Sequence, residues 1–381
     1  MKTRFGKLAS NQIVKHAALL VLLALFMIVA IKVVNNYDKE ELTSTYGRNF
    51  VKATVTEITQ DNLAEDGNRY GDQQVVVRID SGSHKGESID GTSPSGNLFG
   101  AACKVGMKVI VILSESGDTI VATVYSQNRM FWIFIFVAMF VLMLGVVGGW
   151  KGIKSAIALA FALVSILGIF IPVMHRGYSP ILASIILSIA VTIFTIYFVS
   201  GFSKKSTIAI VGTVSGVVLA MVFAVAFGKA AGINGYNVSD VESLIYVANN
   251  SGLKVSQLLF AGLLISALGA VMDVGMSIAS AINEVHETDP SLKAFDLFKS
   301  GMNVGKDMMG TMSNTLILAF TGGSLSTLML NYAYDLPFLQ IINGYNMGIE
   351  IMQCIAGSIG IILTVPITSA LTAYCLGAKG E

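Results

Sequence analysis

The chain has 381 residues, of which 54% are hydrophobic and only 13% are charged, and its formal net charge is +1. Soluble globular domains carry about a quarter of their residues as charged side chains, so this composition argues against an ordinary soluble protein. A net charge so close to zero gives no electrostatic signal for nucleic acid, and we expect no such partner. The three cysteines form no CxxC and no Cys/His cluster, so we expect no metal and no cofactor.

Residues 1–35 predict a cytoplasmic N-terminus followed by a signal-anchor helix. The apolar run at 17–34 could also be read as a secretory signal peptide. It is, however, longer than the ~7–15 residues of a signal-peptide core, and no clear small-residue cleavage site follows it. We therefore expect an uncleaved anchor that places the next domain outside the cytoplasm.

Residues 36–129 predict a small extracytoplasmic β domain. β-branched residues alternate with polar ones in four stretches, 50–58, 73–80, 108–113 and 118–126, which predict strands. Turn-rich segments separate these stretches. Four or five short strands suit a small barrel or sandwich, and we expect an OB-like barrel inserted after the first helix.

Residues 130–381 predict a seven-helix transmembrane domain, which with the anchor gives an all-α membrane bundle of about eight crossings. A crossing needs ~20 mainly apolar residues. The seven apolar segments are 131–149, 154–174, 179–201, 206–228, 255–283, 308–333 and 351–375.

Basic residues predict the orientation of these segments, because cytoplasmic loops are enriched in Lys and Arg. The predicted inside connections and tail contain Lys151, Lys154, Lys204, Lys205, Lys293, Lys299, Lys306 and Lys379. The predicted outside connections contain Arg176, Lys229 and Lys254. This bias places both termini in the cytoplasm.

Local patterns add three expectations. Residues 239–252 predict a short outside helix, because a capping start, helical apolar spacing and a Gly stop follow one another. Residues 291–304 predict a second interfacial helix. The small-xxx-small spacing of Gly212 and Gly216 predicts a close approach of two helix backbones.

Asp273 stands in the middle of the apolar segment 255–283, where a charged side chain costs roughly 2.5–3.5 kcal/mol on insertion scales. It belongs to a helical stripe with Ser266, Gly269, Ser277, Ser280 and Glu284. The opposite face carries Leu264, Leu268, Val271, Ile278 and Ile282. The stripe predicts a proton or cation coupling path formed by Asp273, Ser277, Ser280 and Glu284. The alternative is a hydrogen bond that only holds helices together.

Two later segments supply supporting residues. Thr311, Asn314 and Thr315 enter the membrane in 305–323, and Asn314 could bond Asp273 from an adjacent helix; alternatively, these side chains satisfy a neighbour or their own backbone. In the last segment, Thr364, Pro366 and Thr368 predict a kinked, threonine-lined border of a cavity. Prolines also occur in membrane helices with no transport role.

Enzyme chemistry is not expected. An intramembrane aspartyl protease needs two facing acids, whereas Asp335 falls at the outer end of its helix and Asp273 in the inner half of its own. A serine protease needs a paired base, and no His lies in a membrane segment after the anchor. The nucleotide-binding pattern G-x-x-x-x-G-K-[ST] is not present.

Three long stretches, 262–285, 305–323 and 350–371, resemble the YibE/F-like family of bacterial multipass membrane proteins. The resemblance implies architecture more than activity. Because similar members often occur as two adjacent genes, it also implies a paired homologous membrane subunit. The chain is more weakly similar to half of a SecD/SecF or RND-type permease, and by that analogy Asp273 is the coupling acid.

These observations favour a multi-pass transporter, exporter or permease of the bacterial cell membrane, driven by an ion gradient. Its expected partners are the lipid bilayer, a paired homologous subunit or a second copy of the chain, and an unknown small substrate or peptide. The alternative is a non-transporting membrane scaffold whose β domain binds a protein or an envelope partner.

Overall fold

The computed structural model describes residues 25, 27–43, 47–94, 99–116 and 119–377. Contacts divide the chain into two compact units. One unit is Glu41–Val146, and the other combines Met1–Glu40 with Val147–Glu381.

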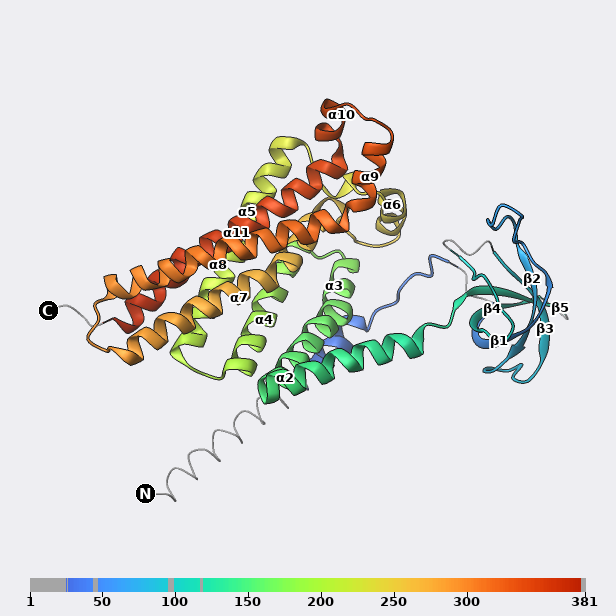
Figure 1. The fold of residues 1–381 in the computed structure, drawn as a ribbon, viewed down its shortest axis with the longest axis horizontal. Coiled ribbons are helices and arrows are strands. Elements are labelled where there is room, and N and C mark those ends of the chain that lie inside the picture. Colours follow the sequence, from blue (N-terminus) through green and yellow to red (C-terminus); the bar gives the residue numbers. More distant parts are fainter. Residues whose placement is uncertain (1–24, 26, 44–46, 95–98, 117–118, 378–381) are drawn as a thin grey trace, which may run out of the picture. The chain divides into compact units, whose positions relative to one another are not determined.

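The first unit is a closed five-stranded barrel with the strand order β1-β2-β3-β5-β4 (Figure 1). Its strands are β1 Arg48–Gln60, β2 Gln73–Ile79, β3 Ser88–Ser93, β4 Lys108–Ser116 and β5 Thr119–Gln127. β1 pairs antiparallel with both β2 and β4, and β3 pairs parallel with β5. Alternate apolar side chains, such as Val75, Val77 and Ile79 of β2, fill the interior.

Four of the five strands coincide with predicted stretches, whereas β3 was not predicted. Its sequence, Ser-Ile-Asp-Gly-Thr-Ser, lacks the alternating large apolar residues that signal a strand. Gly91 explains part of this composition. A Cβ atom at this position would lie 2.6 Å from the carbonyl oxygen of Ala122 on β5, so the barrel closes where a side chain would not fit.

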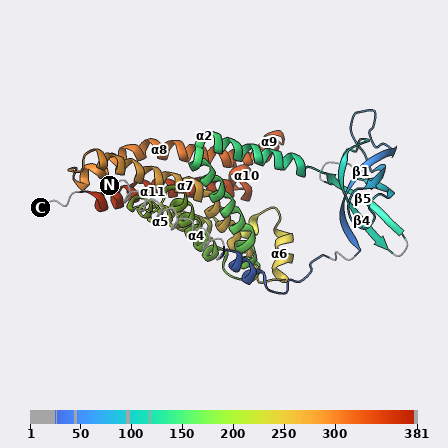
Figure 2. The same cartoon turned by 90° about the horizontal axis from the view of Figure 1, so that it is seen from below.

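The second unit is a helical bundle. Its long helices are α4 Pro180–Ser200, α5 Lys204–Ala231, α7 Leu258–Thr288, α8 Ala294–Gly323 and α11 Tyr345–Leu376. These five lie side by side in both ribbon views, and α7 packs against each of the other four (Figures 1 and 2). Shorter elements connect them, namely η2 Gly235–Asn237, α6 Val241–Asn249, η3 Val255–Gln257, α9 Leu325–Ala333 and α10 Phe338–Asn343.

The predicted helix at 239–252 is confirmed as α6, whereas the separate interfacial helix predicted at 291–304 is wrong. α8 begins at Ala294, so most of those residues form the first turns of one long helix. The charged side chains of this segment, such as Asp296 and Lys299, are exposed on a helix that continues into an apolar segment.

Five helical runs among the described residues are long and apolar enough to cross a membrane, or six if the bent pair α8 and α9 counts as one crossing. The predicted segments 131–149 and 154–174 fall in a single run, Met130–His175, which contains α2 Met130–Ser165, η1 Ile166–Phe170 and α3 Ile171–His175. Gly149 interrupts α2 with φ 54° and ψ −140°. Most of the predicted anchor lies outside the described residues. Its described part, 27–35, is helical and contacts the α2–α3 run, with Asn35 donating to the carbonyl of Gly168.

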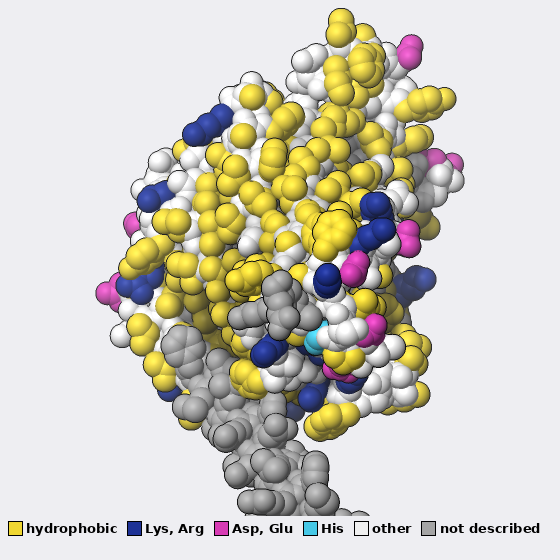
Figure 3. Space-filling model, turned by 90° about the vertical axis from the view of Figure 1, so that its left-hand side faces the viewer, with side chains coloured by type: hydrophobic (Ala, Val, Ile, Leu, Met, Phe, Trp, Pro, Cys, Tyr) yellow, Lys and Arg dark blue, Asp and Glu magenta, His cyan; other side chains and the backbone are white. Residues whose placement is uncertain are grey.

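Large hydrophobic side chains cover much of the exposed surface of the helical unit. On the face drawn in Figure 3 they gather over a broad contiguous area, with charged side chains around it. Exposed side chains of this kind, among them Leu167, Leu182 and Ile186, lie on several helices. Soluble monomers rarely expose contiguous apolar patches larger than a few hundred Å². The surface is therefore consistent with a membrane protein.

The centre of the bundle is a close contact between α5 and α11. Cβ atoms added at Gly212 and Gly216 would collide with the hydroxyl oxygens of Thr368 and Thr364. Gly360 of α11 in turn lies against the backbone of Gly216. The predicted close approach at Gly212 and Gly216 is confirmed, since only hydrogen at these positions lets the two backbones meet.

We predict that Gly216→Ala destabilises the protein by about 1–3 kcal/mol, because the added methyl group forces α5 and α11 apart. Gly262→Ala is the matched control, since nothing lies within 4 Å of a Cβ at that helical position and alanine favours a helix. Thermal unfolding of the full chain in detergent, followed by the monodisperse fraction on size exclusion, measures both. Equal stability of the two variants would contradict the tight contact.

Candidate functional site

The two faces of α7 differ as the sequence predicts. Leu264, Val271, Ile278 and Ile282 are completely buried, and Leu268 is nearly so. These residues join the main hydrophobic core of the bundle. The predicted polar stripe occupies the opposite face. The assignment of a polar and an apolar face to this helix is therefore confirmed.

The polar stripe of α7 lies on the outside of the bundle. Ser266, Gly269, Asp273 and Glu284 are exposed, and Ser277 and Ser280 are half-buried. No described residue hydrogen-bonds to the Asp273 carboxylate or forms an ion pair with it. The acid thus stands unpaired near the middle of a helix long and apolar enough to cross a membrane. An unpaired carboxylate facing hydrocarbon is costly, so this face requires a polar cover or water.

Polar side chains of α8 lie at the same level as Asp273. Ile282 of α7 meets Gly301, and Ala267 and Leu316 both meet Gly357 of α11. This antiparallel register places Gly310 opposite Asp273, with Thr311 and Asn314 within about one helical turn.

The three predicted supporting residues, Thr311, Asn314 and Thr315, are all exposed. Thr311 and Thr315 donate to carbonyl groups of their own helix, which is the alternative that the sequence left open. No hydrogen bond joins Asn314 to Asp273 within the chain, although both side chains are exposed at about the same level of the bundle.

The threonines of α11 face the interior. Thr364 and Thr368 are completely buried at the contact with α5, and Pro366 is half-buried within a helix that continues through it. The Thr364 hydroxyl donates to the carbonyl of Gly360, whereas the Thr368 hydroxyl is buried without a partner among the described residues. Thr364 and Thr368 meet Gly216 and Gly212 of α5, which is a packing contact between helices. The cavity border predicted at Thr364, Pro366 and Thr368 stays a prediction.

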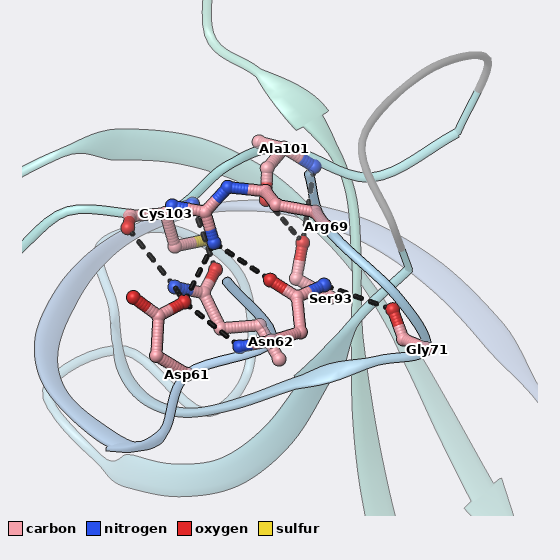
Figure 4. A network of polar contacts seen from close by, with 8 residues as sticks. Asp61, Asn62, Arg69, Gly71, Ser93, Ala101 and Cys103 are labelled. Carbon is pink, nitrogen blue, oxygen red and sulfur yellow. Dashed lines mark hydrogen bonds and ion pairs between the residues drawn. The ribbon is translucent and has the colours of Figure 1, made fainter. Parts of the chain in front are cut away.

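A second polar cluster lies at one side of the β-barrel, and the sequence patterns did not reveal it (Figure 4). Arg69 Nη1 lies 2.6 Å from both Asp61 Oδ1 and Asn62 Oδ1. The buried Gln73 side chain donates to Asp61 and accepts from the backbone N–H of Cys103. The residues of this cluster come from separate turns and strands. They are close only in the folded barrel, so no local sequence pattern indicates them.

The hydrogen bonds of this barrel cluster join the β1–β2 connection, which carries Asp61 and Arg69, to the segment at Cys103 before β4. The hydrogen bond from Arg69 holds the pKa of the Asp61 carboxyl below its usual range. Burial raises the pKa of the Cys103 thiol, which is almost completely enclosed. Ser93 both accepts from and donates to the backbone of Ala101. Within the described residues, no group of three or more His, Cys, Asp or Glu side chains could hold a metal ion.

Comparison with known proteins identifies one family. The family model described as YibE/F-like protein matches residues 136–378, which contain all the long helices of the bundle and the exposed polar residues of α7 and α8. No curated protein and no solved structure matches the chain.

We predict that Arg69→Met loosens the barrel at neutral pH and that this effect becomes smaller in acid, where only the hydrogen bond from Arg69 to the uncharged Asn62 side chain is lost. The folded state lowers the pKa of Asp61, so the stability from this pair is present above the unfolded pKa and is lost as pH falls through the lower folded value. The rate at which 4,4′-dithiodipyridine reacts with Cys103, in a chain carrying Cys354→Ser and Cys375→Ser, reports opening of the barrel. Arg78→Met, at an exposed and longer ion pair, is the control. A difference that persists unchanged to low pH would exclude Asp61 as the cause.

Proposed function

We propose a transport function for this chain, which belongs to the YibE/F-like protein family. In this proposal it is a multi-pass protein of the bacterial cell membrane with both termini in the cytoplasm. The five-stranded barrel, which has the strand number of an OB fold, lies on the outer side. The helical unit moves a small substrate and draws energy from an ion gradient.

One observation carries the proposal: the unpaired Asp273 carboxylate exposed on the polar face of α7. Ionisable groups at this depth are costly and typically mark ion pathways or proton relays. A proton that crosses the membrane potential supplies about 2.3 kcal/mol per 100 mV. Asp273 takes up the ion, Ser277 and Ser280 carry it along the helix, and Glu284 exchanges it with the inner solution. Thr311 and Asn314 of α8 border the same path.

A second copy of the chain is the proposed cover for this path. The exposed polar groups at this level include an acceptor, Asp273 of α7, and an amide donor, Asn314 of α8, which do not pair with each other within one chain. A twofold interface juxtaposes the same surface of both copies, so each Asp273 can meet the Asn314 of the other. Small exposed residues such as Gly269 and Gly310 allow the helices to approach closely.

We predict that Asp273→Asn abolishes ion-coupled flux while leaving folding and abundance intact, because the amide keeps the shape but cannot ionise. Proteoliposomes loaded with a pH-sensitive dye are given a pH gradient and a panel of small amines, acids and peptides. Substrate-dependent proton movement is then recorded. Asp273→Glu should keep part of the flux, and Glu242→Gln, at an exposed acid on α6, should keep all of it. Wild-type flux in Asp273→Asn would refute the coupling role.

The second candidate is a membrane scaffold, favoured by a barrel that forms a compact unit of its own. Deletion of residues 40–128 separates the two proposals. A transporter keeps part of its flux without the barrel, whereas a scaffold loses its whole function. Loss of folded protein on Asp273→Asn, with no flux in any variant, would also favour the scaffold.

We predict that Gly269→Cys in one copy forms a disulfide with Asn314→Cys in a differently tagged second copy, since the two positions lie at the same level of the bundle. The background lacks the native cysteines, and copper phenanthroline oxidises membranes before electrophoresis. Val211→Cys, exposed on α5, replaces Gly269→Cys in the control pair and should form no crosslink. Equal crosslinking of both pairs would show that the disulfides form by random collision between copies, and it would contradict a specific interface.

A further inference from the structure

A cavity of about 440 Å³ lies at the end of the bundle where α8 breaks into α9. The two helices meet at Ser324 with a bend of 59°. The start of α11 and the residues just before α6 complete its wall. Broken helices at membrane depth are tolerated where they are buried in protein or line a cavity, and transporters often bind substrates at such breaks.

Glu350, in the second turn of α11, lines this cavity and has an unsatisfied oxygen. Its Oε2 atom is buried and has no hydrogen-bond partner among the described residues. A buried acceptor without a partner costs free energy, and the cost is higher for a charged group. In the described conformation this oxygen is closed off from the cavity. A positively charged ligand with N–H donors would remove the penalty when the Glu350 side chain turns Oε2 toward it.

The rest of the wall restricts the ligand further. Apolar side chains such as Ile317, Leu328 and Ile351 form most of it, and Thr321, Thr327 and Asn346 add uncharged polar atoms. No Lys, Arg or His is among the residues that line it. Anions therefore have no counter-charge here. A single carboxylate is too few for a divalent cation site, whereas the apolar wall suits an organic body.

The shape of the binding partner follows from two further features. No aromatic ring lines the cavity, so it lacks the cage that favours quaternary ammonium groups. A second cavity of about 420 Å³ adjoins it and shares Ser239, Thr327 and Asn346. Its wall includes one aromatic ring, that of Tyr345, and a single ring does not form a cage. The combined space accommodates a small molecule with a polar extension.

We propose that this cavity binds a small organic cation, an alkylammonium with N–H donors and an apolar body, through the carboxylate of Glu350. The binding itself does not depend on transport. If the proposed transport function holds, this cavity is where its substrate binds, and that second statement rests on the proposed function.

The test uses the full chain in lipid nanodiscs without any ion gradient, with 2-phenylethylammonium as the probe and isothermal calorimetry as the measurement. Empty nanodiscs correct for partition into lipid. Two analogues separate the contributions: 2-phenylethanol lacks the charge, and the N,N,N-trimethyl derivative lacks the N–H donors. We expect saturable binding of the amine and at least tenfold weaker binding of both analogues.

Variants locate the site. Glu350→Gln should weaken amine binding roughly tenfold or more, because the amide removes the charge but keeps the shape. Asp240→Asn, at an exposed acid beside the cavity wall, is the matched control and should bind as the wild type does. Thr321→Phe tests the site independently in case Glu350→Gln does not fold. Its ring fills the cavity and leaves Glu350 in place, so amine binding should weaken.

The outcomes separate this proposal from the coupling role of Asp273. Asp273→Asn should bind the amine with unchanged affinity, so loss of flux with intact binding supports both proposals. The cavity proposal is overturned if the amine does not saturate, if the alcohol binds equally well, or if neither Glu350→Gln nor Thr321→Phe weakens binding. Any of these results leaves the flux test of Asp273→Asn unaffected.

Discussion

The contact between α5 and α11 is the constraint on which the rest of the helical unit depends. Gly212 and Gly216 bring the two backbones together, and Gly360 of α11 lies against Gly216. Gly275 of α7 lies over the same place, against the Thr213 hydroxyl. Three helices therefore meet at one close contact, which glycines and threonine hydroxyl groups form. Packing of this kind replaces the hydrophobic driving force that is missing between helices in lipid.

This close contact determines which face of α7 is buried against other helices. The helix packs one face against α5 and α11, with α4 and α8 at its sides, and its buried leucines, isoleucines and valines occupy that face. The side that carries Ser266, Gly269 and Asp273 remains exposed because no described helix is left to pack on it. A polar face that was only packing within the chain would be buried, as Thr364 and Thr368 are. Its exposure is the physical argument for a role that involves another surface or water.

Sequence patterns predicted the features that depend on local periodicity. The two faces of α7, four strands of the barrel and the close approach at Gly216 each follow from residue spacing. β3 could not be predicted from local spacing, because a close contact with the distant strand β5 requires the glycine at position 91. The direction in which Asp273 faces also depends on distant contacts, since a stripe shows which residues share a side but not what covers it. The cavity at Glu350 could not be predicted either, because segments far apart in the sequence form its wall.

The two carboxylates have different surroundings, which suit different tasks. Glu350 lines a cavity and its Oε2 atom is buried, whereas the Asp273 side chain is exposed on α7. α11 connects them physically: it carries Glu350 near its start, and two turns later Gly357 rests on Ala267 of α7, within two turns of Asp273. A movement of α11 that closes the cavity must therefore shift its contact with α7. Coupling between distant sites needs such a packed element with more than one arrangement. Both α8 and α11 extend from the cavity wall to the level of Asp273.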